Sequence, residues 1–380
     1  MDRKKLKLFI LVSEDWSFLS HRLSLAQSAI NADFDVTVFT KVNELEEKIE
    51  EKGINVINVN FVRTLKFPLI DILNIIKLIF IFRREKPDIV HNVALKTILI
   101  GSTAGLFIKN STIVNAFTGL GYVFSSNQFQ AKIIRLFIKP IFNLLTRKRN
   151  YWSIFQNPDD FNLFNSLGLI EQERSVIIRG SGVDTNEFLQ TTDINNIPVV
   201  MLASRMLWDK GVEEFVKAAK RAHKEKLKAK FILVGDVDKD NPMSIPISTI
   251  MQWVNEGYVV WEGHCNDMPK KLSDASIVCL PSYREGLPKV LLEAAAIGRP
   301  LIGTDVPGCR EIVRNGENGI LVKLKDVDSL YEAIKLLVSN QQMRQSMGKR
   351  SREIVESELS SDIINLQTIE LYKRAKNINC

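Results

Sequence analysis

Short β-rich runs alternate with helix-forming segments along the whole chain, and this alternation constrains the fold more than any other feature of the sequence. In the first half, the strand-like runs are Leu6–Val12, Phe34–Thr40, Ile54–Val59, Asp88–Asn92, Thr112–Phe117, Trp152–Gln156 and Ser175–Arg179. The segments that favour helix are Phe18–Ala32, Glu44–Lys52, Leu69–Arg84, Leu99–Lys109 and Phe129–Arg149. Strands that alternate with helices predict a parallel sheet with helices on both faces.

The second half repeats this scheme. Its predicted strands are Ile197–Ala203, Ala229–Val234, Tyr258–Glu262, Ile277–Leu280, Leu301–Thr304 and Gly319–Val322. Val212–Leu227 has the spacing of an amphipathic helix, and the tail favours helix from about Ser329 to Ala375. We therefore expect an α/β protein with two Rossmann-like parallel-sheet domains that face a ligand cleft between them.

Glycines on either side of Ser181 predict a hinge between the two domains. We expect a first domain at residues 1–181, a linker at 182–197 and a second domain at 198–357. Residues 358–380 are predicted to form a C-terminal helix, for which a return to the first domain is one option. With 380 residues in total, each domain has enough chain to bury a core of its own.

The cysteines and the first strand favour a cytoplasmic location. Cys265, Cys279, Cys309 and Cys380 are widely separated and form no C-x-x-C pattern, which argues against a disulfide framework and against a zinc site. Leu6–Val12 is short and runs directly into acidic residues, so we interpret it as a strand rather than a secretory signal.

Positive charge is concentrated in the first half. Residues 61–150 hold 14 Lys and Arg against 3 Asp and Glu, and no acidic residue lies between Ile89 and Trp152. Such a charge balance suits an anionic partner. The basic stretch is aliphatic rather than interleaved with stacking aromatic residues, so nucleic acid is the least favoured of the possible partners.

The helix expected at residues 128–149 is basic and amphipathic. Its cationic side and the segment that follows carry Lys132, Arg135, Lys139, Arg147, Lys148 and Arg149. This pattern favours contact with an anionic membrane surface, and it is equally typical of a core helix with a solvated basic face. The apolar segment Phe67–Phe82 is interrupted by Asp71, Asn74 and Lys77, so it falls short of the roughly 20 residues that a membrane span needs.

The segment from Pro281 to Pro300 has the features of a binding site. Glu285 lies in a polar loop after a buried strand, and Glu293 lies within the helix that begins near Pro288. A helix N-terminus between two carboxylates suits an elongated ligand with a diphosphate in its middle, such as a nucleotide-sugar. The alternative is an ordinary loop glutamate followed by an ordinary helix glutamate.

Two cations follow the first strand of the second half. Arg205 and Lys210 lie where the carboxyl edge of a parallel sheet is expected, which is where open α/β folds bind ligands. A guanidinium and an ammonium suit a diphosphate and its departing charge, although such residues are often simply solvated. Gly235, at the end of the next strand, allows close backbone approach at the same edge.

These motifs together resemble the retaining, GT-B-fold glycosyltransferases of family 4. The resemblance is carried by Arg205 and Lys210, by Glu285-Gly286-Leu287-Pro288 with Glu293, and by Gly180-Ser181-Gly182-Val183-Asp184. Within the family, the chain is most similar to bacterial enzymes that extend saccharides on polyprenyl diphosphate, including N-acetylgalactosaminyltransferases of lipid-linked glycan assembly and O-antigen enzymes of lipopolysaccharide biosynthesis.

The resemblance implies a role for each matching residue. Arg205 and Lys210 would hold the diphosphate, Glu285 would face the donor sugar, and Glu293 would hold the ribose. The backbone at Gly286, Leu287 and Pro288, together with Gly235, would support the sugar and phosphate, and His264 would lie beside the base. Such enzymes need no metal or cofactor, and the acceptor hydroxyl attacks from the face that the leaving group departs.

The chain departs from the family pattern after the first strand. Many relatives have a Gly-Gly loop there, whereas this chain has Ser13–Arg22, so the contacts of that loop stay open. Candidates for the acceptor side are His21, Arg22, His91 and Lys96, and His91 is favoured because it ends a predicted strand.

The two D-x-D sequences at residues 236–238 and 326–328 lie in ordinary loops, so no metal site is expected.

We therefore expect a metal-independent retaining glycosyltransferase. It would move a sugar, an N-acetylhexosamine, from a UDP-sugar to a polyprenyl-diphosphate-linked saccharide, working as a peripheral protein on the inner face of the bacterial cytoplasmic membrane. One alternative is a sugar epimerase or phosphorylase on the same fold with soluble substrates. Another is a non-catalytic protein that binds nucleotide-sugars.

Overall fold

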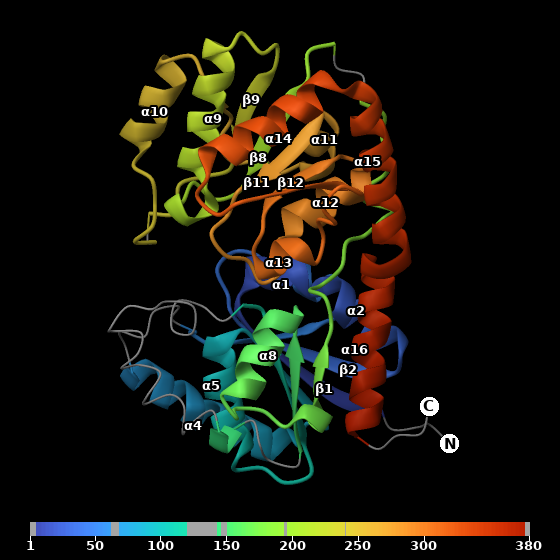
Figure 1. Ribbon diagram of the computed structural model, residues 1–380. Coiled ribbons are helices and arrows are strands. Elements are labelled where there is room, and N and C mark those ends of the chain that lie inside the picture. Colours follow the sequence, from blue (N-terminus) through green and yellow to red (C-terminus); the bar gives the residue numbers. More distant parts are fainter. Residues whose placement is uncertain are drawn as a thin grey trace. The chain divides into compact units, whose positions relative to one another are not determined.

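The computed structural model describes residues 5–61, 68–119, 143–145, 150–193, 196–239 and 241–376. The chain divides into two compact units, one of Met1–Ser181 with Ser361–Cys380 and the other of Gly182–Ser360 (Figure 1). The six basic residues of the predicted membrane helix lie outside the described residues, namely Lys132, Arg135, Lys139, Arg147, Lys148 and Arg149.

The first unit is built on a parallel seven-stranded sheet with the order β3-β2-β1-β4-β5-β6-β7. Its strands are β1 (Leu6–Glu14), β2 (Phe34–Lys41), β3 (Asn55–Asn58), β4 (Ile89–Val93), β5 (Thr112–Phe117), β6 (Tyr151–Phe155) and β7 (Ser175–Ile177). The seven strands predicted for the first half are confirmed, because each observed strand overlaps its predicted run.

The helices of this unit differ more from the prediction. They are α1 (Asp15–His21), α2 (Leu23–Asn31), α3 (Glu46–Glu50), α4 (Pro68–Glu85), α5 (Leu95–Gly105), α8 (Pro158–Ser166) and α16 (Ser361–Ala375). The single helix expected at 18–32 is two, because Arg22 has a non-helical backbone with φ −132°. The sequence analysis missed α8, although Asn157 accepts a hydrogen bond from the Asp160 amide as its N-cap.

The C-terminal helix α16 belongs to the first unit. Asn365 donates from its side-chain amide to the Ser24 hydroxyl at 2.7 Å and to the Ser28 hydroxyl at 3.1 Å, which ties α16 to α2. Near the end of α16, the ring of Tyr372 is fully buried and meets Phe34 edge-on, with 6.0 Å between the ring centroids. Chain from the far end of the sequence therefore completes the core of the first unit.

The second unit is built on a parallel six-stranded sheet with the order β10-β9-β8-β11-β12-β13. Its strands are β8 (Val199–Ala203), β9 (Lys230–Val234), β10 (Val260–Trp261), β11 (Ile277–Leu280), β12 (Leu301–Thr304) and β13 (Gly319–Val322). Its helices are α9 (Val212–Lys224), α10 (Ile247–Asn255), α11 (Met268–Ser273), α12 (Lys289–Ile297), α13 (Pro307–Arg310), α14 (Val327–Ser339) and α15 (Gln341–Ile354). The helices α10, α11 and α13 were not predicted.

The predicted continuous helix of the tail is interrupted twice. Asn340 has an extended backbone and caps α15 with its side chain, which accepts a hydrogen bond from the Met343 amide. A π-helical segment, Val355–Leu359, then leads through the extended residue Ser360 to α16. These two interruptions separate α14, α15 and α16.

Each sheet is buried on both faces, as the alternation of strands and helices predicts. Along β1, Leu8 and Ile10 join one hydrophobic core, whereas Phe9 and Leu11 join the core on the opposite face. Side chains in a strand alternate between the two faces, so a strand covered on both sides must be apolar throughout. No described helix is long and apolar enough to cross a membrane.

Each strand order reverses at one point. The reversal falls between β1 and β4 in the first unit and between β8 and β11 in the second. In open parallel sheets, the loops that leave the carboxyl ends of two such strands diverge and create a site for ligands. The fold therefore directs attention to the loops after β8 and β11.

Gly211 fixes how closely those two loops approach. It has φ +72°, and a Cβ atom added to it would lie 2.1 Å from the Pro281 carbonyl oxygen. Gly257 has a similar φ of +78°, but open space surrounds its Cβ position. Substitution of Gly257 by alanine therefore costs backbone strain alone, whereas the same change at Gly211 costs backbone strain and a steric clash.

We predict that Gly211→Ala lowers the free energy of unfolding by about 3 kcal/mol, whereas Gly257→Ala lowers it by about 1 kcal/mol, the cost of a left-handed backbone alone. Urea denaturation followed by circular dichroism measures both. Equal losses for the two variants would show that the loop after β11 moves away easily and that the close approach is not a constraint.

Candidate functional site

The loops after β8 and β11 bring together two charged side chains. The Lys210 Nζ atom lies 2.5 Å from Glu285 Oε1, and both side chains are mostly withdrawn from solvent, with 21% and 11% of their surface exposed. The sequence analysis assigned both residues to the donor site. An ion pair at the reversal point of the sheet places a cation and a carboxylate where a ligand of this fold binds.

Hydrogen bonds hold the two loops against each other. The Asp209 carbonyl oxygen accepts from the Tyr283 amide at 2.8 Å and from the Ser282 hydroxyl at 3.1 Å. The Tyr283 hydroxyl donates to Glu214 Oε1 at 2.8 Å, and the Lys325 ammonium group lies 4.4 Å from the centre of the tyrosine ring. Sequence reasoning missed Tyr283 and Glu214, because only the pairing of β8 with β11 brings them together.

Arg205 does not join the Lys210–Glu285 pair. Its Nη1 atom lies 2.5 Å from Asp238 Oδ2, in the loop after β9, and about half of the arginine side chain is exposed. Gly235, also after β9, has φ +126°, and a Cβ atom on it would lie 2.0 Å from the Ser204 carbonyl oxygen. Asp238 was set aside in the sequence analysis as a false metal motif, and its observed partner is the guanidinium.

The helix α12 begins directly after the Glu285 loop. Pro288 is its N-cap residue, and its side chain makes no capping hydrogen bond to the helix. Gly308 supports the loop from behind, because a Cβ atom on it would lie 2.6 Å from the Gly286 carbonyl oxygen and 2.7 Å from that of Glu285. The sequence analysis missed Gly308.

Glu293 lies one turn into α12 and is buried. Burial raises the pKa of its carboxyl group, and the ammonium group of Lys289, 3.2 Å away, opposes this effect. His264 lies after β10 and is exposed, and its Nε2 atom is 3.0 Å from Asn266 Oδ1. The loops after β8, β9, β10 and β11 thus supply every donor-side candidate except Glu293, which lies in α12.

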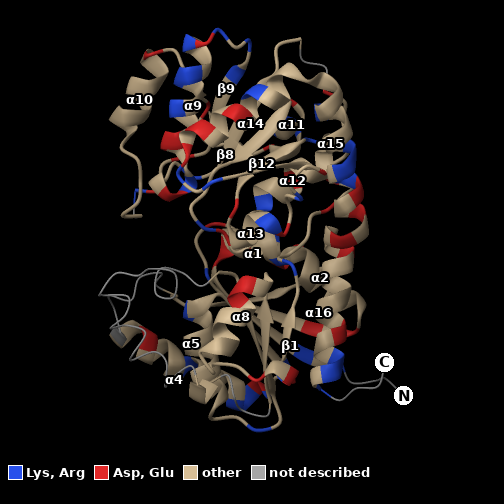
Figure 2. Ribbon diagram, in the orientation of Figure 1, with Lys and Arg blue, Asp and Glu red and all other residues tan. Residues whose placement is uncertain are grey.

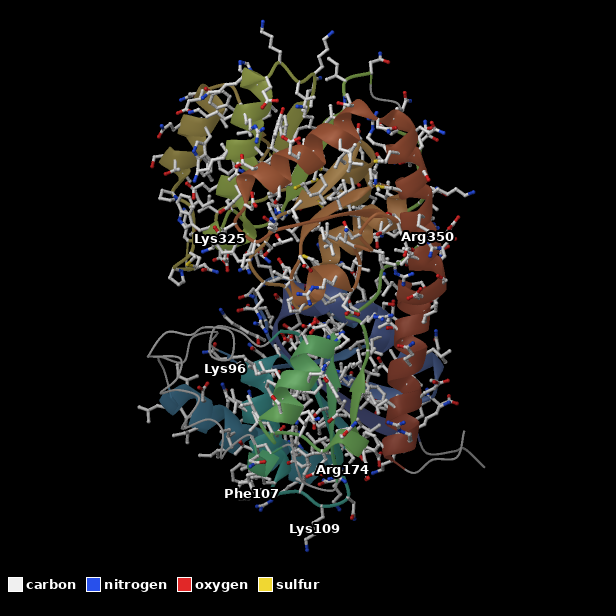
Figure 3. The ribbon with its side chains drawn as sticks, in the orientation of Figure 1. Lys96, Phe107, Lys109, Arg174, Lys325 and Arg350 are labelled. Atoms are coloured by element: carbon white, nitrogen blue, oxygen red, sulfur yellow. The ribbon has the colours of Figure 1, made fainter. Side chains whose placement is uncertain are left out.

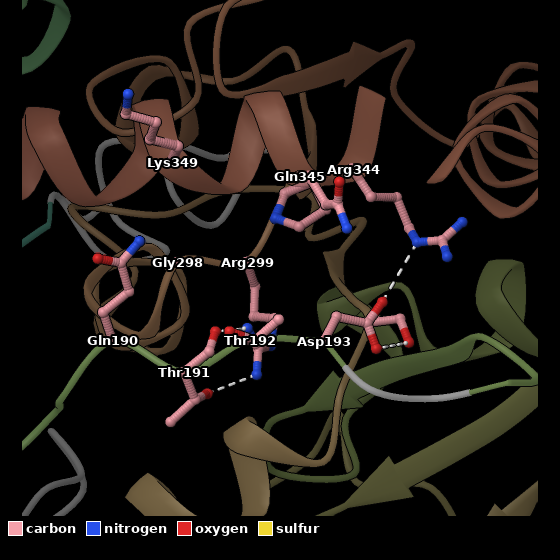
Figure 4. Close-up of a pocket in the computed structure, with 11 residues that line it drawn as sticks. Gln190, Thr191, Thr192, Asp193, Gly298, Arg299, Arg344, Gln345 and Lys349 are labelled. Atoms are coloured by element: carbon pink, nitrogen blue, oxygen red, sulfur yellow. Dashed lines mark hydrogen bonds and ion pairs between the residues drawn. The ribbon is translucent and has the colours of Figure 1, made fainter. Parts of the chain in front are cut away.

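A separate pocket of about 400 Å³ lies at the opposite edge of this sheet, before β11 and β12 (Figure 4). Its two arginines are engaged in structural contacts. Arg299 is buried and donates to Thr191 at 2.6 Å and to the Ser273 carbonyl oxygen at 2.9 Å. Arg344 contacts Asp193 at 3.3 Å and the last carbonyl groups of α14. We therefore place the candidate site at the carboxyl edge.

The acceptor-side candidates lie in the first unit. His91, on β4, is fully buried and shares a hydrogen bond between its Nδ1 atom and the Tyr372 hydroxyl. Arg22 is also buried, and the Lys96 ammonium group lies 2.5 Å from Asp71 Oδ2. His21 is partly buried at the end of α1. The burial of His91 favours a structural role in joining β4 to α16.

The described residues contain no group of three or more His, Cys, Asp or Glu side chains that could hold a metal ion. Both D-x-D sequences have local partners instead. Asp238 pairs with Arg205, and Asp326 caps α14 by accepting a hydrogen bond from the Ser329 amide. Asp328 pairs with Arg221 at 2.8 Å.

Two family sequence profiles match the chain. The profile described as Glycosyl transferases group 1 matches residues 197–340, and the profile described as Glycosyl transferase 4-like matches residues 7–150. Together they cover well over half of the sequence.

Individual relatives agree with these profiles. The N,N'-diacetylbacillosaminyl-diphospho-undecaprenol alpha-1,3-N-acetylgalactosaminyltransferase of Campylobacter jejuni is 27% identical over 95% of this chain and 99% of its own. The UDP-Gal:alpha-D-GlcNAc-diphosphoundecaprenol alpha-1,3-galactosyltransferase of Escherichia coli is 26% identical over 74% of both chains.

Solved structures show the same fold. Sucrose-phosphate synthase from Thermosynechococcus elongatus superimposes with a TM-score of 0.81, covering 97% of this chain and 99% of its own at 19% identity. An Anabaena protein solved with UDP and glucose gives a TM-score of 0.79, covering 97% of this chain and all of its own at 18% identity. This chain belongs to the family 4 glycosyltransferases and has the GT-B fold. The fold class and the family predicted from the sequence are confirmed.

The buried imidazole of His91 gives a prediction about pH. Burial, and secondarily the charge of Arg22, hold the pKa of His91 well below its usual value of 6.5. Below about pH 6.5, His91 binds a proton in the unfolded chain but stays neutral in the folded chain. The free energy of unfolding therefore decreases as the pH falls, by up to about 1.4 kcal/mol per pH unit.

We predict that His91→Gln weakens this dependence, so that the free energy of unfolding falls less between about pH 6.5 and pH 5 than it does in the wild type. Urea titrations at several pH values measure the slope. His223→Gln, which removes an exposed imidazole on α9, is the matched control. A wild-type slope in His91→Gln would show that another group dominates the acid dependence.

Proposed function

We propose that this glycosyltransferase transfers a sugar, an N-acetylhexosamine, from a UDP-sugar to a saccharide linked to polyprenyl diphosphate. The observation that carries the proposal is the Lys210–Glu285 pair at the reversal point of the second sheet, in a chain of this family. The substrate classes are supported by the names of the Campylobacter and Escherichia relatives, and UDP by the Anabaena structure.

The proposed reaction uses the charges at this edge. The acceptor hydroxyl replaces the diphosphate at the anomeric carbon, and its proton leaves with the departing UDP. Lys210, with Arg205 released from Asp238, stabilises the negative charge that develops on the diphosphate. The helix N-terminus of α12 places backbone amides of positive potential toward the phosphate or sugar oxygens. Glu285 binds the donor sugar, and Glu293 binds the ribose hydroxyls.

We propose that the transfer retains the anomeric configuration and needs no metal ion or cofactor, because fixed cations supply the positive charge. In this scheme the enzyme works at the inner face of the bacterial cytoplasmic membrane, where a polyprenyl-diphosphate acceptor would be reached. The basic character of residues 61–150 suits an acceptor diphosphate and anionic lipid, which supports this location.

We predict that Glu285→Gln lowers the transfer rate at least about 100-fold while UDP binds within about threefold of wild type, because a contact made at the donor sugar is lost and the diphosphate contacts stay. Product formation with a synthetic polyprenyl-diphosphate acceptor and calorimetric titration of UDP measure the two effects. Glu317→Gln, at an exposed carboxylate paired with Arg350, is the control. Wild-type turnover in Glu285→Gln would defeat the assignment.

We predict that UDP-N-acetylhexosamines stabilise the protein against heat and that GDP-sugars do not. At about 100 times the dissociation constant, a ligand specific for the folded state adds about 2.7 kcal/mol. Lys210→Met should abolish most of the shift, and EDTA should change neither the shift nor the turnover. Activity that EDTA removes and Mg²⁺ restores would contradict the metal-free mechanism, and stabilisation by GDP-sugars alone would contradict the choice of donor.

A further inference from the structure

The outward face of α4 carries a continuous row of large apolar side chains. Between 45% and 75% of each is exposed to solvent, and the members of this apolar row are Leu69, Ile72, Leu73, Ile76 and Phe80. Their spacing of three, four, seven and eleven residues from the first places them on one side of the helix. Figure 2 shows that most of α4 carries no charge.

The opposite face of α4 accounts for its packing in the first unit. Leu78 and Phe82 are fully buried in the core beneath the sheet, and the ring of Phe82 lies 5.8 Å from that of Phe9. Asn74 is also buried and donates from its side-chain amide to the Asn60 carbonyl oxygen at 2.8 Å. The helix is therefore fixed by one face, and the apolar row is not needed to hold it in place.

The charges around the apolar row are mainly positive. Lys77 donates to the Asn58 carbonyl oxygen at 2.7 Å, and Arg83 donates to the Phe107 carbonyl oxygen at 3.3 Å, so each cation keeps its net charge. Arg84 shares Glu85 with Lys7. The acidic residue in the first turn, Asp71, is neutralised by Lys96.

We propose that this outer face of α4 docks on an anionic lipid surface, with the apolar row in the acyl region and Lys77, Arg83 and Arg84 at the headgroups. Exposed apolar patches of this kind mark interaction surfaces, and a helix with an apolar face and flanking cations suits the boundary of an anionic bilayer. The net positive charge of this surface favours anionic lipid over a second copy of this chain, whose α4 would present the same charge.

This inference deepens the proposed function, on which it rests for the membrane-borne acceptor, by naming the surface that brings the enzyme to it. It also differs from the sequence-based expectation, which placed the membrane contact at residues 128–149. Phe107, whose carbonyl oxygen accepts a hydrogen bond from Arg83 in the last turn of α4, is half exposed, and Figure 3 shows Phe107 and Lys109 at the periphery of the first unit.

The test is co-sedimentation of the full chain with vesicles of phosphatidylcholine, with and without phosphatidylglycerol. We expect binding to the anionic vesicles and at least about tenfold weaker binding by the double variant Leu73→Glu with Phe80→Glu. Leu336→Glu with Leu366→Glu is the matched control, because these leucines are similarly exposed on α14 and α16, and we expect it to bind within twofold of wild type. Melting temperatures confirm that each variant is folded.

A second measurement places the helix at the bilayer. Tryptophan at position 80, from Phe80→Trp, should be quenched by brominated lipid, whereas tryptophan from Leu366→Trp should not. Full vesicle binding by the Leu73→Glu, Phe80→Glu variant, or the absence of quenching, would overturn the proposal. So would a change from dimer to monomer in that variant with unaltered vesicle binding, which would assign the face to a second copy.

This experiment uses no donor, acceptor or turnover, so its outcome is separate from that of the proposed reaction. Glu285→Gln should bind vesicles as the wild type does. Loss of transfer in that variant with retained vesicle binding supports both proposals. Vesicle binding that survives the α4 changes overturns the docking surface alone.

Discussion

The contact between Gly211 and the Pro281 carbonyl group is the constraint on which the candidate site depends. Because this glycine has no side chain, the loop after β8 lies directly against the loop after β11, and the Asp209 carbonyl oxygen is bonded by Ser282 and Tyr283. Lys210 is then held at Glu285 by the two adjoining loops. Fixing charged groups in advance lowers the cost of ordering them when a charged substrate arrives.

The strands were predictable because burial on both faces of a parallel sheet forces continuous apolar runs, which stand out in the sequence. The ends of helices were harder to predict. Arg22 interrupts a segment whose apolar spacing continues through it, and Asn340 divides the long helix expected in the tail. Both breaks depend on local backbone geometry that hydrophobic spacing does not report.

The sequence predicted the charged residues of the candidate site, but it did not predict which residues they contact. Arg205, Lys210 and Glu285 follow strand ends, and strand ends were recognisable. Two contacts, Arg205 with Asp238 and Tyr283 with Glu214, depend on which strands are neighbours in the sheet. Local sequence patterns do not predict the order of strands. The outer face of α4 was not predicted either, because the apolar segment Phe67–Phe82 was considered only as a possible membrane span.

The central claim is that a nucleoside diphosphate binds at the carboxyl edge of the second sheet. Hydrogen–deuterium exchange with and without UDP tests it directly, because bound phosphate protects the amides that it contacts. We predict slower exchange at residues 205–211 and 285–292, with no change around Thr191 and Arg344 at the opposite edge. Protection confined to the Thr191–Arg344 pocket, or no protection at saturating UDP, would contradict the account.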